Sequence, residues 1–171
     1  FYKEDLLNRI NFLKNKNKKS IYREIIECNE VVYACKQHTD SSLSIVQLDM
    51  DFNDIKTIIS NDVNKYGFVP FTIIPNPIYK SIVALQVLKI NKTDPSLIIW
   101  DIDNSRAIKT IDDTFYFDWS CDGNILYYSN AFTDVQHGKK INYFKSIYLN
   151  SLDEELLFTD NDNDAIWIQP I

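Results

Sequence analysis

The sequence predicts an all-β protein made of successive four-stranded antiparallel blades, part of a β-propeller, after a short N-terminal helix or linker. From residue 25 onward, short runs rich in Val, Ile, Tyr, Phe and Trp alternate with clusters of Asn, Asp, Gly and Pro. This close spacing leaves no room for the helical crossovers that parallel strands require, so we expect antiparallel hairpins. One strand-loop-strand pattern also recurs about every 50 residues, which is in the range of propeller blades.

Composition narrows the class of protein. The chain has 171 residues, of which 45% are hydrophobic and 13% aromatic, so we expect one globular domain. The net charge of -6 argues against nucleic acid as a partner. Its longest apolar stretches are far shorter than the roughly 20 residues of a membrane-spanning helix, so we expect no membrane partner.

The ends of the chain and its cysteines bear on location. The first residue is Phe rather than Met, which is typical of an excerpt or a processed chain, so any targeting information is missing. The three cysteines, Cys28, Cys35 and Cys121, form a sparse, odd-numbered set. Such a set suits a reducing compartment better than a disulfide scaffold, and we expect the cytosol.

The first 20 residues differ from the rest. Leu6, Leu7, Ile10 and Leu13 have helical spacing, and a polar Lys/Asn run follows them. A solvated connector is the commoner outcome for such a run than a docking patch. We therefore expect a helix or linker over residues 1–20 and a partial propeller over residues 21–171.

Twelve β-rich runs follow, and no further helix is expected. Each has the length of a strand in an antiparallel sheet. The runs cover residues 25–35, 44–48, 55–59, 68–74, 81–90, 96–102, 107–111, 115–119, 125–130, 143–149 and 155–159, with a last piece near 165–168.

The repeat divides these runs into about three blades. The clearest turn is Asp122-Gly123, because glycine supplies the positive φ of a tight hairpin turn. One blade earlier, Pro75-Asn76-Pro77 supplies the turn by different chemistry. The predicted blades are residues 66–112 and 113–160, preceded by a blade over residues 21–61 whose completeness the sequence pattern leaves open.

Catalytic residues are not expected in this chain. A hydrolase nucleophile on a sharp turn needs Gly-x-Ser-x-Gly, and none of the three glycines, Gly67, Gly123 and Gly138, belongs to such a motif. The two histidines, His38 and His137, flank hairpin-like loops. We interpret both as ordinary surface residues rather than as bases or substrate contacts.

Cofactor or metal sites are not expected either. Cys28 and Cys35 lack the spacing of zinc ligands, and we interpret them as buried structural thiols. The run of Asp160, Asp162 and Asp164 resembles a calcium loop but lacks the central Gly and final Glu of the EF-hand, which favours a solvated turn.

The tryptophans could form a ligand-stacking set, but aromatic residues in blade strands usually fill the space between neighbouring sheets. We therefore expect packing between sheets for Trp100, Trp119 and Trp167.

The third blade resembles a known family. Residues 115–129, which contain the motif Trp-Ser-Cys-Asp-Gly-Asn-Ile-Leu-Tyr-Tyr, are followed by Lys-Ser-Ile-Tyr-Leu (145–149) and Glu-Glu-Leu-Leu-Phe (154–158). This order resembles the N-terminal propeller of the prolyl oligopeptidase family, particularly its oligopeptidase B branch. Residues 66–72 and 100–103 are similar to the preceding family blade. The chain departs from the pattern at residues 74–77, where the family usually has Ser-Pro-Asp-Gly, and at Cys121, where it has Pro or Ala.

This resemblance implies that the propeller and the catalytic domain have separate roles. The intact protein would be a serine oligopeptidase whose seven-bladed propeller caps a C-terminal α/β-hydrolase domain and limits substrates to short peptides. The hydrolase domain and the peptide would then be this segment's partners, and the chemistry would lie outside this chain. Two alternatives stay open: a propeller used only as a protein-interaction scaffold, and a pseudoenzyme whose nucleophile is replaced.

Overall fold

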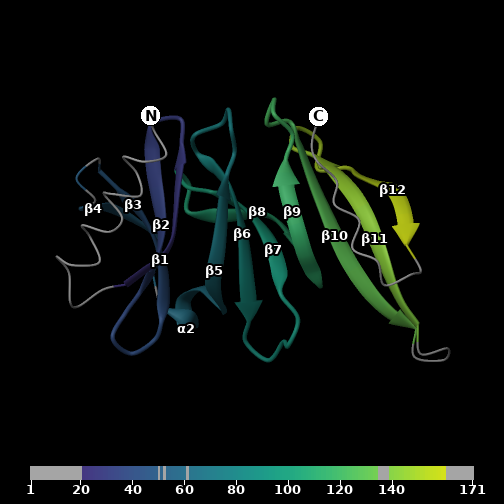
Figure 1. Cartoon of the computed structure of the whole chain (residues 1–171), viewed down its shortest axis with the longest axis horizontal. Helices are drawn as coiled ribbons and strands as arrows, with labels where there is room; N and C mark the ends of the chain where they lie inside the picture. The colour runs from purple at the N-terminus through teal and green to yellow at the C-terminus, as the bar shows by residue number, and fades with distance from the viewer. Residues whose placement is uncertain (1–20, 50, 52, 61, 135–138, 161–171) are drawn as a thin grey trace.

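The chain folds into three four-stranded antiparallel sheets that lie side by side (Figure 1). The computed structural model describes residues 21–49, 51, 53–60, 62–134 and 139–160. The first sheet contains β1 (Ile21–Cys28), β2 (Val31–Gln37), β3 (Leu43–Leu48) and β4 (Asp54–Ile59); the second contains β5 (Phe68–Pro75), β6 (Ile82–Lys89), β7 (Ser96–Asp101) and β8 (Arg106–Ile111); the third contains β9 (Thr114–Trp119), β10 (Ile125–Asp134), β11 (Lys139–Tyr148) and β12 (Glu154–Asp160).

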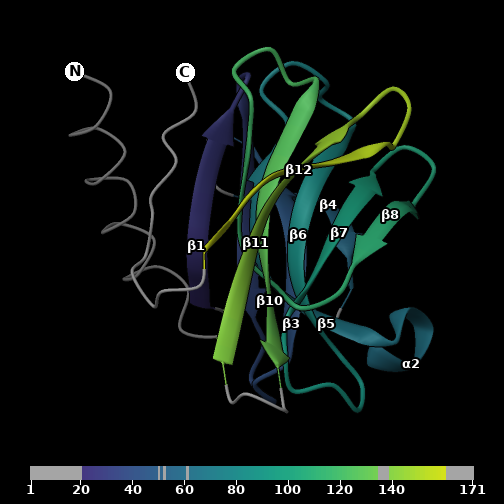
Figure 2. The same ribbon diagram turned by 90° about the vertical axis from the view of Figure 1, so that its right-hand side faces the viewer.

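Each sheet is a meander in which every strand pairs with the next one in sequence. The turns between first and second strands lie at one end of the sheets, called the upper end here because the β5–β6 and β9–β10 turns point up in Figure 1. The connections between second and third strands, and those from one sheet to the next, lie at the lower end. Seen from the side, the third sheet stands in front of the other two (Figure 2). The predicted all-β architecture of four-stranded blades is confirmed.

The first sheet differs from its prediction. The run over residues 25–35 is not one strand, because the chain reverses at Asn29 and Glu30, whose φ values are 51° and 65°. Two consecutive residues with positive φ form the tight turn that suits the twist of a hairpin. This sheet therefore has all four strands, which completes the blade over residues 21–61. A single helical turn, α2 (Val63–Tyr66), was also not expected and lies between β4 and β5.

Two apolar clusters fill the spaces between the sheets. The cluster between the first and second sheets, called the first seam, includes Ile45, Leu85 and Trp100. The cluster between the second and third sheets, called the second seam, includes Ile99, Leu126 and Trp119. Trp100 and Trp119 are each 4% exposed, which confirms the predicted packing between sheets for these two tryptophans.

The first strand of each following sheet lies against the preceding sheet: β5 is near β1, β2 and β3, and β9 is near β7. In the second seam, Trp119 Nε1 of β9 donates to the Ile74 carbonyl of β5 at 3.1 Å. Gln86 Nε2 of β6 donates to the Thr114 and Phe115 carbonyls of β9, each at 3.1 Å. These bonds join a side chain of one sheet directly to the backbone of the next. The first-strand edges are therefore held together by short contacts.

A buried asparagine joins the upper ends of the second and third sheets. Asn76 is 1% exposed, and its Oδ1 accepts hydrogen bonds from the backbone N–H groups of Ile78 and Tyr79. Its Nδ2 donates to the Gly123 carbonyl at 2.7 Å. A Cβ atom on Gly123 would lie 2.4 Å from Asn76 Oδ1, so only glycine fits there. The two turns singled out in the sequence are thus in direct contact.

This contact predicts the effect of Gly123→Ala, for which Gly67→Ala is a matched control. Both glycines have positive φ, at +70° and +72°, but a Cβ at Gly67 meets no atom within 4 Å. Gly67→Ala should therefore lower the free energy of unfolding by only about 1–2 kcal/mol, the cost of a left-handed backbone at a residue with a Cβ atom. Gly123→Ala should cost about 1–3 kcal/mol more, because the overpacked Asn76 must move. Urea unfolding of both variants measures the difference, and equal losses would contradict the contact.

Candidate functional site

The histidine that the structure describes stabilises a turn. His38 lies between β2 and β3, and its Nε2 is 2.9 Å from the Oγ of Ser44. Ser44 is only 2% exposed, so its hydroxyl is not presented to a substrate. The nearby Asp40 carboxylate accepts hydrogen bonds from Ser42 rather than from His38. His137 lies outside the described residues.

The three cysteines occupy different environments, and all are free thiols. Cys35 is fully buried, and burial raises the pKa of its thiol to about 11. Cys28 is partly buried with its Sγ 3.5 Å from the Asn76 carbonyl, and burial raises its pKa as well. The structural interpretation is confirmed for Cys35 and holds in part for Cys28. Cys121 is exposed in the turn between β9 and β10.

Metal ligands do not gather in the part of the chain that the structure describes. Within it, no three His, Cys, Asp or Glu side chains lie close enough to hold an ion. Asp162, Asp164 and Trp167, and the side chain of Asp160, lie outside the described residues. Among the described residues, no helix has the length and apolar character needed to cross a bilayer.

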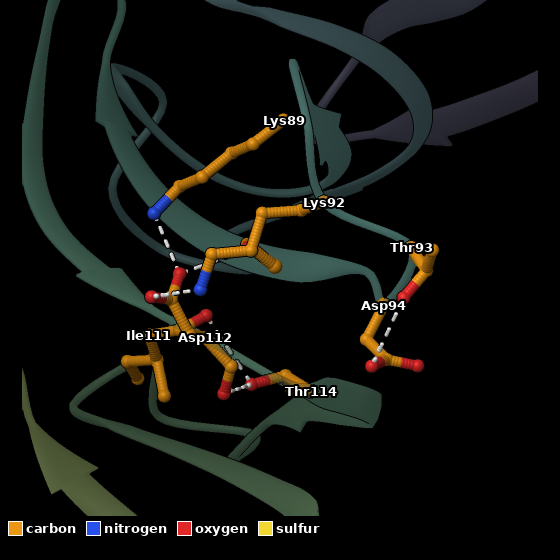
Figure 3. Close-up of polar contacts among 8 residues, drawn as sticks. Lys89, Lys92, Thr93, Asp94, Ile111, Asp112 and Thr114 are labelled. Atoms are coloured by element: carbon orange, nitrogen blue, oxygen red, sulfur yellow. Dashed lines mark hydrogen bonds and ion pairs between the residues drawn. The ribbon is translucent and has the colours of Figure 1, made fainter.

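A charged cluster fixes the lower end of the second sheet to the start of the third (Figure 3). Asp112 Oδ1 accepts from Lys89 Nζ at 2.5 Å and from Ser96 Oγ at 2.9 Å, and its Oδ2 accepts from Lys92 Nζ at 3.2 Å. Thr114 N–H then donates to the Pro95 carbonyl at 2.9 Å. The hydrogen bond from Lys89 is the main reason that the pKa of Asp112 falls to about 2. The cluster determines where the third sheet begins.

The cleft in the first seam is the candidate binding site. It opens at the upper end and has a volume of about 180 Å³. One wall is a row of residues paired across the first sheet, Tyr33, Gln47 and Lys56. Opposite them, the two upper turns of the second sheet contribute Lys80 and Asp103, among other residues.

Backbone hydrogen bonds hold the walls of this cleft. Tyr33 Oη donates to the Lys80 carbonyl at 3.2 Å and so connects the two sheets at the floor. Ile102 N–H donates to the Ser81 carbonyl at 2.8 Å, which joins the two turns of the second sheet. The charged ends of Lys56, Lys80 and Asp103 form no ion pair with any described residue. The cleft therefore presents two unpaired cations and one unpaired anion.

Sequence reasoning did not identify this cleft. Its residues come from β2, β3 and β4 and from two turns of the next sheet, so no local motif contains them. The one feature of the sequence that could have indicated the cleft was the repeat of the blades. Lys56 and Lys109 occupy matching places in their blades, and the residues facing them could have been compared.

The Asp112 cluster predicts an acid-dependent loss of stability. The folded-state pKa of about 2 lies below the ordinary value of 3.8, so the stabilisation is present above about pH 4 and is lost as the pH falls toward 2. Asp112→Asn should lower the free energy of unfolding at pH 7 by about 1 kcal/mol, because the carboxylate is 42% exposed and solvent screens it. The difference between variant and parent in urea unfolding should shrink at pH 2. An undiminished difference at pH 2 would show that the charge is not the cause.

Comparisons with solved structures identify the architecture. The chain superposes on a structure from a study of two prolyl endopeptidases with a TM-score of 0.65 at 14% identity, covering 81% of this chain and 22% of that one. Oligopeptidase B from Leishmania major gives 0.64 at 12% identity, with 91% and 23% covered. The acylaminoacyl peptidase of Pyrococcus horikoshii gives 0.62 at 12% identity, with 88% and 27% covered.

The sequence identities and the coverages determine what the comparisons support. No family model matches the sequence, and a search of curated proteins gives no match. The chain spans about a quarter of each peptidase chain that it matches. At 12–14% identity the likeness concerns the fold. The resemblance to the propeller of prolyl oligopeptidase-type enzymes, first indicated by the Trp-Ser-x-Asp-Gly hairpin, is confirmed at the level of that fold.

Proposed function

We propose that this chain is a non-catalytic part of the propeller of a serine oligopeptidase and that the propeller admits short peptides to a C-terminal α/β-hydrolase domain. The observation that carries the proposal is the fold likeness, over 81–91% of this chain, to three peptidases of this type. A propeller would act sterically: a ring with a narrow channel passes a flexible peptide and excludes a folded protein.

The contacts between the sheets support a rigid ring. Short side-chain-to-backbone hydrogen bonds join the first-strand edges, whereas the outer strands are bridged by the long side chains of Lys109 and Glu154. Sheets that converge on one edge and diverge at the other form an arc around an axis on the first-strand side. Repeating this arc closes a ring with the first strands lining its channel.

The path of the chain favours one end of the ring for the hydrolase domain. β1 enters the first sheet at the lower end, and β4, β8 and β12 all run toward the lower end. A domain that follows the last blade directly would therefore start from the lower end. On this proposal the Asp112 cluster lies on the side of the ring that faces the catalytic domain.

Three finer points belong to the same proposal. Membership of the oligopeptidase B branch is supported by the order of motifs in residues 115–158 and by the likeness to the Leishmania major enzyme. A cytosolic location is supported by three free thiols, one of them exposed. The division into a linker over residues 1–20 and a propeller over residues 21–171 is supported by the change of sequence pattern from helical spacing and a Lys/Asn run to short β-rich runs.

The protein with all its blades and any following domain tests this function. A fluorophosphonate probe, which reacts with activated serines, should label it at a serine C-terminal to residue 171. The protein should also cleave an octapeptide but not folded or long denatured polypeptides. An interaction scaffold would show no labelling and no cleavage, and a pseudoenzyme would contain the hydrolase fold but fail to react.

A seam variant separates the gating role from the enzyme class. Glu154→Gln weakens the outer bridge of the second seam, and Glu155→Gln is a matched control because the Glu155 carboxylate accepts a hydrogen bond from Tyr148 of its own sheet. If the ring gates access, Glu154→Gln should raise the rate on a 30-residue peptide relative to the octapeptide at least twofold. An unchanged ratio, with normal serine labelling, would contradict gating while leaving the enzyme class intact.

A further inference from the structure

The first and second seams contain the same lysine in the same place. Lys56 of β4 pairs with Gln47 of β3, and Lys109 of β8 pairs with Ile99 of β7. Both lysines are on the face of their sheet that is turned toward the next sheet, Lys56 in the first seam and Lys109 in the second. The two seams can therefore be compared position by position.

In the second seam, a carboxylate of the neighbouring sheet neutralises the lysine, Lys109. Lys109 Nζ lies 2.9 Å from Glu154 Oε1, and Tyr128 Oη donates to Glu154 Oε2 at 2.7 Å. These contacts hold the pKa of Glu154 below its ordinary value, although burial acts in the opposite direction. The carboxylate of β12 thus closes the outer part of the second seam.

The first seam has no such carboxylate, and the register shows why. Ile102 N–H donates to Ser81 and Leu149 N–H donates to Asn124, so these turns are equivalent in the second and third sheets. Counting back from them makes Trp100 equivalent to Ile147, and their partners on the fourth strands are Ala107 and Glu154. Alanine therefore stands where the second seam has its glutamate.

The first seam, which Ala107 faces, also contains the cleft of about 180 Å³; Lys56 and Lys80 line this cleft, whereas Ala107 itself does not. A cavity of about 150 Å³ holds a benzene-sized molecule, so this space is large enough for a small ligand. Among the described residues, Asp103 is the one carboxylate in the lining, and it forms no ion pair with either lysine. The net charge of the cleft is positive in a chain whose overall charge is -6.

We propose that the cleft of the first seam binds the carboxylate group of a small ligand, which takes the place that the Glu154 carboxylate fills in the second seam. Lys56 and Lys80 are the cations that hold it, and Val31 and Ile102 provide apolar contact for the rest of the ligand. The free C-terminus of a short peptide and an acidic side chain both carry this group. The proposal goes beyond the peptidase function and holds without a hydrolase domain.

The test is a titration of the full chain followed by amide chemical shifts. Both lysines are exposed, and exposed ion pairs are weak, so we expect dissociation constants in the millimolar range. The probes are acetyl-Ala-Ala with a free C-terminus, the same dipeptide as its amide, and acetyl-Glu amide. Shifts at residues of the cleft should saturate with the free acid and not with the dipeptide amide. Binding of acetyl-Glu amide alone would assign the site to acidic side chains, and binding of both acids assigns it to the carboxylate in general.

Variants tie the binding to the proposed residues. Lys56→Met should weaken binding by up to about fivefold, the upper limit for one exposed ion pair, whereas Lys65→Met, which removes the same charge from α2, should not change it. Ala107→Glu should abolish binding by restoring the carboxylate of the second seam, and it should leave the fold intact because Ala107 is exposed. Equal binding of the acid and the amide, or unchanged binding in Lys56→Met, would overturn the proposal. Neither outcome bears on serine labelling, so this proposal and the peptidase function fail independently.

Discussion

Packing between successive sheets is the constraint on which the rest of the structure depends. Both faces of the second sheet are buried, with Leu85 and Val87 turned toward the first sheet and Ala84 and Ile99 toward the third, all 0% exposed. Burying one such Val, Leu or Ile side chain contributes about 1.5–3 kcal/mol, which no isolated sheet could recover from its own contacts. The second sheet is therefore stable only between two neighbours. The hydrogen bonds across the seams fix how each sheet is positioned against its neighbour.

Packing between the sheets also explains which strands could be predicted from the sequence. Strands buried on both faces are continuous apolar runs, and the predicted runs over residues 81–90 and 96–102 match β6 and β7 closely. β1 carries Arg23, Glu24 and Glu27 on a partly exposed strand, so its first residues were missed. The turn after it was missed because Asn29-Glu30 lacks the glycine that usually marks positive φ. The turn between β1 and β2 is present, but without glycine it has no simple sequence signal, so two strands were predicted as one run.

Contacts across the seams could not be predicted from local pattern. The Asn76 and Gly123 turns were each singled out, but nothing in either segment shows that they touch across 47 residues of chain. The cleft has the same origin, since its residues come from separate strands and turns of two sheets. Such features follow from the repeat only after its exact register is known. Register came from the hydrogen bonds of Ile102 and Leu149, which the sequence does not contain.

The turns show how the fold persists while the sequence drifts. With only 3 glycines in the chain, several left-handed positions are held by other residues, including Asn91, Ser105 and Asp113. Asp49, Asp101 and Asp122 each accept a hydrogen bond from the backbone N–H two residues on, so an aspartate side chain organises the turn. Many side chains can meet these local demands. This tolerance accounts for a fold match at 12–14% identity.

The two seams show where such drift is free to change function. Neighbouring sheets are held together by the two apolar cores and, in the second seam, by the hydrogen bond from Trp119 of β9 to Ile74 of β5. The outer strands lie beyond these contacts, so residues there can change without disturbing them. Glu154 and Ala107 are such a pair: Glu154 bridges the second seam to Lys109, whereas the first seam has alanine at the matching place and contains a charged cleft. A repeat built this way keeps its inner edge constant and can acquire different binding sites at its outer edge, one seam at a time.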